Sequence, residues 1–234
     1  MNDALVNLIV VLADNKWSLG FHLSEWAVGA PVLESGVATA AIAQGHMGQA
    51  RVLYPLLEEL GFPMSDEGDR RRYRVSAVDD PFPSWPHVVA ALLAVDGALN
   101  TLLLSLQRSR SEQLARRVGR MLEEERFQRD FAEGRVRELC AFPGGRDFLQ
   151  ERVDAVLPEM LCWFGPPGEP GVAALAEEGL LVGDGDRWRQ DYLDRVAPVL
   201  LEADVALPLR RAGTTWEIDD LPWDRWNPLQ RRLT

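Results

Sequence analysis

Apolar residues recur every three to four positions along most of the chain, which is the spacing of one buried face of an α-helix. Regular alternation of apolar and polar residues, the pattern of a half-buried strand, is missing. Glycine and proline clusters divide the helical pattern into segments. The predicted helices cover about 3–29, 32–60, 84–106, 111–139, 147–164, 172–178 and 187–204. The polar run Asp14-Asn15-Lys16 is a candidate break in the first of them.

The third predicted helix carries an almost continuous apolar run from Val88 to Leu106, which places it at the middle of a bundle. A membrane span is the alternative, and Asp96 and Asn100 within the run argue against it. Four long antiparallel helices predict a four-helix bundle over about 3–139, followed by additional C-terminal helices and an extended tail over about 147–234. We expect one domain over 1–234. The tail contains Trp216, Trp223 and Trp226 and should wrap over a surface.

Composition narrows the classes of function. The chain has 234 residues, with 25 basic and 36 acidic side chains and a formal charge of -11, which argues against a nucleic-acid partner. The apolar stretch Leu5–Leu12 is too short to span a bilayer and lacks the features of a signal peptide. A chain of this length needs no disulfide framework, so Cys140 and Cys162 need not be paired, and they favour a reducing compartment. We therefore expect a cytoplasmic protein with neither a nucleic-acid nor a membrane partner.

Polar residues interrupt the apolar stripe of each long helix, where burial is costly unless a partner satisfies them. The first and third helices each supply one carboxylate, and that of the first lies one turn from Phe21 and Val28. The second and fourth helices each supply a polar pair at i, i+3 spacing. The set is Glu25, Asp96, the pair His46 and Gln49, and the pair Glu125 and Gln128.

Along the chain these groups follow the order carboxylate, polar pair, carboxylate, polar pair, which resembles a known type of metal site. Ferritin-like bundles hold two metal ions with one carboxylate from each of two helices and a Glu-x-x-His pair from each of the other two. Here the pairs read His46-x-x-Gln49 and Glu125-x-x-Gln128, and an amide oxygen is a poor ligand for iron. Two interpretations stay open. One is a hydrogen-bonded core network with no metal cofactor. The other is iron or manganese held by Glu25, His46, Asp96 and Glu125.

Further candidates are weaker. His22 lies one turn before Glu25, where it could act as an extra ligand, although a histidine on the helix surface is the commoner case. His87 is expected to be a partly exposed residue at a helix start. The run Arg70-Arg71-Arg72-Tyr73-Arg74 is either a solvated loop or a contact for the phosphates of coenzyme A.

Short segments spread over more than half of the chain carry a family resemblance. They are Ala13-Asp14-Asn15-Lys16, Leu23-Ser24-Glu25-Trp26, Gly29–Glu34, Gly48–Tyr54, Phe82-Pro83-Ser84-Trp85, Asp96, and Glu123–Phe127. Together they resemble the phenylacetic acid catabolic family, the large subunits of phenylacetyl-CoA ring-epoxidising monooxygenases. The resemblance implies a ferritin-like fold and a bacterial multicomponent oxygenase that adds one atom of dioxygen to the ring of a coenzyme A thioester.

In that family a catalytic subunit with a di-iron centre pairs with a similar metal-free structural subunit. The resemblance implies that Glu25, Asp96 and Glu125 match family ligands, that His46 replaces a glutamate, and that Gln49 and Gln128 replace histidines. These departures favour the structural, partner-holding subunit or a diverged relative.

We expect binding to a paralogous oxygenase subunit, or self-association into a homo-oligomer, through a helical face and the tail tryptophans Trp223 and Trp226. An acyl-CoA molecule is a further candidate ligand. The alternative function is a metal-dependent oxidoreductase that uses dioxygen.

Overall fold

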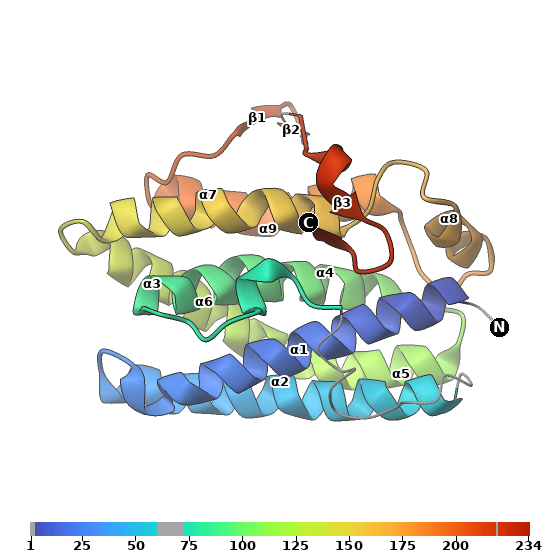
Figure 1. The fold of residues 1–234 in the computed structure, drawn as a ribbon, viewed down its shortest axis with the longest axis horizontal. Helices are drawn as coiled ribbons and strands as arrows, with labels where there is room; N and C mark the ends of the chain where they lie inside the picture. Colours follow the sequence, from blue (N-terminus) through green and yellow to red (C-terminus); the bar gives the residue numbers. More distant parts are fainter. Residues whose placement is uncertain (1–2, 60–72, 219) are drawn as a thin grey trace.

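The computed structural model describes residues 3–59, 73–218 and 220–234, and it confirms an all-α, ferritin-like bundle. The helices are stacked in layers (Figure 1). An outer layer is the hairpin of α1 (Asp3–Gly29) and α2 (Leu33–Glu59), which pack along their whole lengths. The opposite side is formed by α7 (Gly145–Trp163) and α9 (Gly185–Glu202), with α8 (Pro170–Glu177) beside the start of α1.

Between these layers lies the apolar rod predicted to be central. It consists of α3 (Trp85–Ala90), one turn of π-helix (η3, Ala91–Val95) and α4 (Asp96–Gln107), and its residues from Val88 to Asp96 are all buried. The predicted helix 111–139 is divided into α5 (Glu112–Met121) and α6 (Glu125–Ala141) by a 3₁₀ turn, η4 (Leu122–Glu124).

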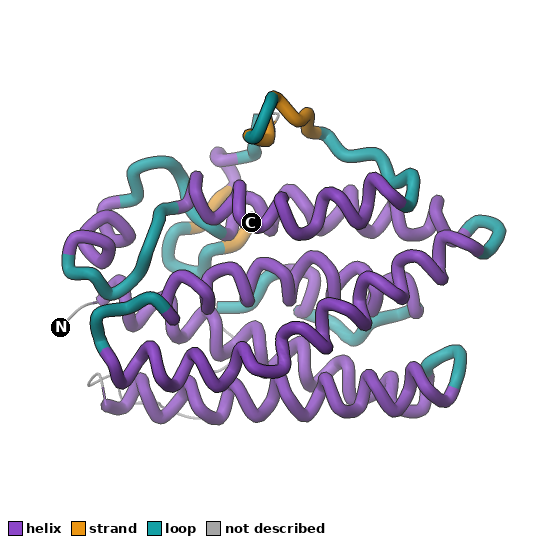
Figure 2. Tube along the Cα trace, turned by 180° about the vertical axis from the view of Figure 1, so that it is seen from behind, coloured by secondary structure: helices purple, strands orange, loops and turns teal. Residues whose placement is uncertain are grey.

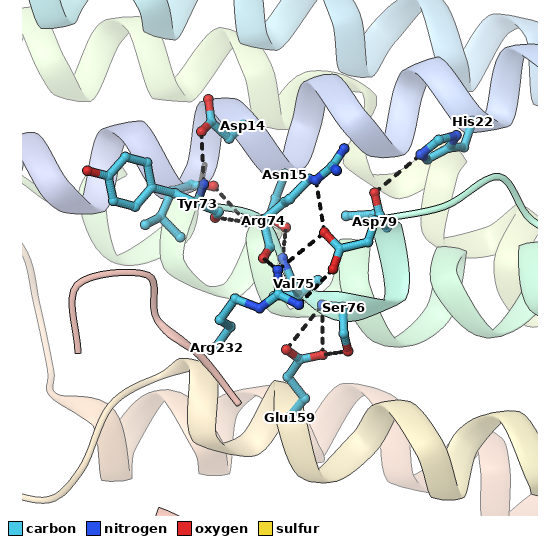
Figure 3. Close-up of polar contacts among 12 residues, drawn as sticks. Asp14, Asn15, His22, Tyr73, Arg74, Val75, Ser76, Asp79, Glu159 and Arg232 are labelled. Carbon is cyan, nitrogen blue, oxygen red and sulfur yellow. Dashed lines mark hydrogen bonds and ion pairs between the residues drawn. The ribbon is translucent and has the colours of Figure 1, made fainter. Parts of the chain in front are cut away.

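The candidate break at Asp14-Asn15-Lys16 is wrong, because α1 is continuous there. Both Asp14 and Asn15 are buried, and their side chains hold the segment 73–79 that crosses α1 (Figure 3). Asn15 Nδ2 donates to the Tyr73 carbonyl at 3.0 Å, and the Val75 amide donates to Asn15 Oδ1 at 2.9 Å. The Tyr73 amide donates to Asp14 Oδ2 at 3.2 Å. The buried side chains of Asp14 and Asn15 therefore supply hydrogen-bond partners for the backbone of the crossing segment.

The same segment is tied to the far side of the molecule. Within it, η2 (Ser76–Val78) is a short 3₁₀ turn, and the Ser76 amide donates to both carboxylate oxygens of Glu159 on α7, at 3.0 and 3.1 Å. Arg232, near the C-terminus, donates to Asp79 Oδ2 at 2.7 Å (Figure 3). The crossing segment thus joins α1, α7 and the tail.

The tail contains strands that the sequence pattern did not predict. They are β1 (Leu209–Ala212) with β2 (Thr215–Ile218), and β3 (Trp226–Asn227) with β4 (Arg232–Leu233), all antiparallel and orange in Figure 2. A 3₁₀ turn, η5 (Trp223–Arg225), precedes β3. Strands of two to four residues are too short for a period of two to be recognised.

The tail does wrap over the protein's own surface. Trp216 is buried, and its indole donates to Asp194 Oδ1 on α9 at 2.9 Å. The guanidinium carbons of Arg189 and Arg231 lie 5.4 and 5.6 Å from ring centres of Trp223 and Trp226. The rings of these two half-buried tryptophans are therefore partly covered by cations of the same chain.

Within the described residues, two helical rods, Asp3–Gly29 and Trp85–Gln107, are long and apolar enough to cross a membrane. Their most apolar windows are 78% and 89% buried inside the protein. Core helices of a bundle meet the same criterion, so this finding is weak evidence for a membrane span.

Candidate functional site

A fully buried lysine lies where the helices α1, α2 and α4 meet. Lys16 Nζ donates to Asp96 Oδ1 at 2.6 Å and to Asn100 Oδ1 at 2.9 Å, and it lies 3.4 Å from Nδ1 of His46. An ammonium group has three donors and no acceptor, so each of its three protons has an acceptor here. We call Lys16, His46, Asp96 and Asn100 the lysine cluster.

Local backbone features bring these side chains together. Gly20 follows Lys16 by one turn, and a Cβ added there would lie 2.9 Å from the Ala43 carbonyl oxygen and 3.0 Å from the Cβ of His46. Glycine therefore permits the close approach of α1 and α2 beside the cluster. Asp96 follows the π-helical turn directly, and such turns are frequent at functional sites. Asn100, one turn further on, donates to Asp96 Oδ2 at 3.0 Å.

Burial and charge set the protonation of the cluster. The pKa of His46 is lowered from 6.5 to about 4, mainly by burial and also by the charge of Lys16, against the raising effects of Asp96 and of a hydrogen bond with Gln49. Burial alone would raise the pKa of Asp96, but the charge of Lys16, together with His46 and Asn100, holds it below its usual value. At neutral pH the cluster therefore holds a neutral imidazole and an ammonium–carboxylate pair. Because lysine can only donate, the proton of His46 is on Nε2, which lies 3.8 Å from Asp96 Oδ1.

The carboxylate of Glu125, the first residue of α6, is paired with two arginine side chains. Arg195 on α9 donates to Glu125 Oε1 at 3.0 Å, and the Arg129 guanidinium lies 3.8 Å from the same oxygen. Asp96 and Glu125 line one small cavity of about 20 Å³. A space of this size holds about one water molecule. Asp96 and the half-buried Glu125 thus line the same small cavity, and each is paired with a side-chain cation.

Glu25 was expected in this cluster, and that prediction is wrong because the residue is exposed on α1. The stripe used to place it also contains Phe21 and Val28, which are 44% and 95% exposed. That stripe is the outer face of the helix. The inward face is the one with Lys16, Leu19 and Leu23, all fully buried.

The glutamines at 49 and 128 are buried, at 6% and 2% exposure. Gln49 Nε2 donates to the Met121 carbonyl at 2.9 Å, which links α2 to the end of α5. Within the described residues, Gln128 Oε1 has no hydrogen-bond partner. Both glutamines thus lie on buried helix faces, as predicted, and Gln49 joins two helices.

Lys16 was missed as a site residue. It stands four positions after Leu12 and three before Leu19, on the line of buried leucines, so the i, i+3, i+4 rule could have found it. A buried lysine without a partner would be very costly, and this cost signals a nearby carboxylate. Only acidic, amide and imidazole side chains were considered as metal ligands in the sequence, so a buried lysine was not considered.

The residues present do not fit a two-metal centre. Across residues 3–59, 73–218 and 220–234, no group of three or more His, Cys, Asp or Glu side chains could hold a metal ion. The strongest acceptor, Asp96, is already paired with Lys16, and Glu125 with Arg195. A metal ion would have to displace both cations to reach these oxygens.

The weaker candidates lie elsewhere. His22 is buried rather than on the surface, with Nε2 3.2 Å from the Val78 carbonyl oxygen. His87 is half-buried at the start of α3, 2.7 Å from Ser84 Oγ and 2.8 Å from an Arg152 nitrogen. Arg70–Arg72 lie outside the described residues, while Arg74 is paired with Asp79 at 2.9 Å.

Comparisons with known proteins agree with the family resemblance. The sequence model of a family described as "Phenylacetic acid catabolic protein" matches residues 1–223. A curated protein of Escherichia coli (strain K12), named as one of the subunits of 1,2-phenylacetyl-CoA epoxidase, is 26% identical over 212 residues, which are 87% of this chain and 84% of that protein.

Proposed function

The chain belongs to the phenylacetic acid catabolic protein family, and on that premise we propose that it is a metal-free subunit of a phenylacetyl-CoA epoxidase-type assembly. Its task is to bind and stabilise a partner subunit. The E. coli relative bears the name of one subunit among several in such an epoxidase, which supports membership of a multi-subunit assembly. The observation that carries the metal-free assignment is Lys16, whose ammonium lies 2.6 Å from Asp96 at the centre of the bundle.

The physical argument is one of charge. A divalent cation brought beside Lys16 would meet a like charge in a poorly solvated interior, where electrostatic interactions are stronger than in water. Moving Lys16 away would leave a buried ammonium without its carboxylate, which is also costly. Lys16 and Arg195 therefore neutralise Asp96 and Glu125 in place of metal ions.

The test of the metal-free assignment is elemental analysis of protein produced with iron and manganese supplied. We expect far less than one metal ion per chain, and the same for Glu125→Ala. Stoichiometric metal in the wild type that is lost in Glu125→Ala would contradict the proposal. That result would favour the alternative, an oxidoreductase that uses dioxygen, with His46, Asp96 and Glu125 as ligands.

The test of the partner-binding role uses the paralogous subunit from the same genome that carries two intact Glu-x-x-His pairs. When the two purified chains are mixed, we expect a complex in sedimentation velocity. Two separate species at micromolar concentration would contradict the role. A cytoplasmic location and an acyl-CoA ligand stay predictions.

A further inference from the structure

We propose that the outer face of α2, together with the adjoining side of α5, is the docking site for an acidic amphipathic helix of the partner subunit; this inference rests on the proposed function. A groove of about 670 Å³ runs between the two helices. Its walls include Ala41, Gly45, Gly48 and Val52 of α2, and Arg117 and Arg120 of α5. We call it the α2 groove.

The face that contains the groove is turned to solvent and carries several apolar side chains beside the exposed Gln44. Along the outer side of α2, Leu33 is 78% exposed, Val37 64% and Val52 39%. Positions 35–57 contain no acidic residue, in a chain with 36 of them. The solvent side of a surface helix is normally charged or polar. An apolar face of several turns is typical of a helix that packs against a partner.

Small residues in the middle of this face favour close approach of another backbone. A Cβ added to Gly48 would meet no heavy atom within 4 Å, so no contact among the described residues requires glycine there. Glycine in a helix interior is destabilising relative to alanine. Ala41 and Gly45 extend the shallow floor by two turns towards the start of α2. A partner helix lying in the groove would explain why short side chains stand in these positions.

The charge of the groove selects the partner. Arg117 and Arg120 line it, and among the residues that the structure describes no acidic side chain does. Arg117 is paired with Glu59 at 2.6 Å, whereas Arg120 is exposed and has no ion pair within the described ranges. A basic rim in a protein of charge -11 favours carboxylates on the partner helix. A second copy of this chain is a poorer occupant, because a two-fold axis through the groove would bring the same arginines face to face.

The experiment measures binding of the purified paralogous subunit with two intact Glu-x-x-His pairs. Ala41→Glu places a longer, charged side chain in the groove, where it would repel the acidic helix, and we expect the Kd to rise at least about tenfold. The matched control is Ala174→Glu, on an exposed position of α8 at the far side of the molecule, which should bind as the wild type does (Figure 1). Circular dichroism of both variants checks that the bundle is intact.

A second variant tests the contribution of the positive charge of Arg120 at the edge of the α2 groove. Arg120→Glu should weaken binding about three- to tenfold at low salt, mainly through slower association, and the difference should shrink at high salt. Arg108→Glu changes the charge of the protein equally, at an exposed position outside the groove, and should have no such effect.

The outcomes separate the two proposals. If Ala41→Glu and Arg120→Glu both bind the partner with the affinity of the wild type, the α2 groove is not the docking site, while the partner-binding role stands. Failure of the wild type itself to bind would overturn the role, and this inference with it. A dimer of the chain alone that Ala41→Glu dissociates would show that a second copy occupies the groove, against the proposed occupant.

Discussion

Lys16 and Asp96 form an ion pair that is almost entirely removed from water, with side-chain exposures of 0% and 4%. Desolvation of the two charges offsets much of their attraction, so the pair adds little net stability. Removing only one partner is a different matter, because the other charge then stays buried and uncompensated.

We therefore predict that Lys16→Met lowers the free energy of unfolding by about 3–5 kcal/mol. Adding Asp96→Asn to Lys16→Met should recover a large part of this loss, because the orphaned carboxylate is gone. Urea denaturation of the wild type, both single variants and the double variant gives the coupling free energy. Strictly additive effects would show that the two side chains do not depend on each other.

His46 makes stability depend on pH in a defined window. Its pKa is lowered from 6.5 to about 4 in the folded protein, so the unfolded chain takes up a proton first as the pH falls. The contribution of the neutral imidazole is complete above pH 6.5 and is lost towards pH 4, by roughly 3 kcal/mol in all. Asp96, with a lowered pKa, loses its contribution only in more acid solution.

Denaturation at a series of pH values, with His46→Gln as the comparison, measures this effect. The difference in unfolding free energy between the two proteins should change by roughly that amount between pH 7 and pH 4. A constant difference would mean that His46 titrates normally in the folded state.

For single residues, the sequence predicted that four polar side chains are buried, because each stands on a long apolar stripe. They are His46, Asp96, Gln49 and Gln128. The prediction failed at Glu25, where an exposed stripe with Phe21 and Val28 was taken for a buried one. Exposed apolar residues are common, so a stripe alone does not tell the inside of a helix from the outside.

Among the elements, the contact between α1 and α2 depends on Gly20. A Cβ there would come within 2.9 Å of the Ala43 carbonyl oxygen, closer than packed atoms allow. The helices would have to separate beside the lysine cluster. Gly48, in the middle of α2, has open space in the corresponding direction.

The same substitution should therefore have opposite effects at these two glycines. Gly20→Ala should destabilise the protein by about 1–3 kcal/mol through overpacking. Gly48→Ala should stabilise it by up to about 1 kcal/mol, because alanine is the better helix former. Thermal or urea unfolding of both variants measures the contrast, and equal effects would contradict the close approach.

The existence and order of the long helices could be predicted from apolar spacing, whereas their irregular turns could not. The π-helical turn at Ala91–Val95 lies inside an unbroken apolar run, and the 3₁₀ turn at Leu122–Glu124 contains no glycine or proline and directly follows none. In both places packing against other helices, rather than local sequence, decides the backbone. The polar pair Asp14-Asn15 was misjudged for the same reason, because its partners lie about 60 residues away.

At the scale of the whole molecule, the tail and the bundle are connected by buried contacts. Arg231, only 1% exposed, donates to the Trp163 carbonyl at 3.0 Å and to Glu169 at 2.7 Å. Arg232 reaches Asp79 on the segment that crosses α1. These contacts couple the C-terminal extension to the core.

We expect the chain to unfold as one unit, in line with the single domain predicted from the sequence. Tryptophan fluorescence, which includes Trp216, Trp223 and Trp226 of the tail, should follow the same urea transition as the loss of helix measured by circular dichroism. Two separate transitions would indicate that the extension folds independently of the bundle. Arg231→Met should lower the urea midpoint measured by tryptophan fluorescence and the midpoint measured by circular dichroism by the same amount.

The position of Lys16 has a consequence for how such a protein could change. Placing histidines at 49 and 128 would supply two imidazoles, yet the carboxylate of Asp96 would still be paired with Lys16. A mutational path back to metal would have to remove the lysine as well, and Lys16→Met alone is expected to be damaging. The buried ammonium group thus acts as a ratchet against metal binding, since the step that frees Asp96 passes through a less stable protein.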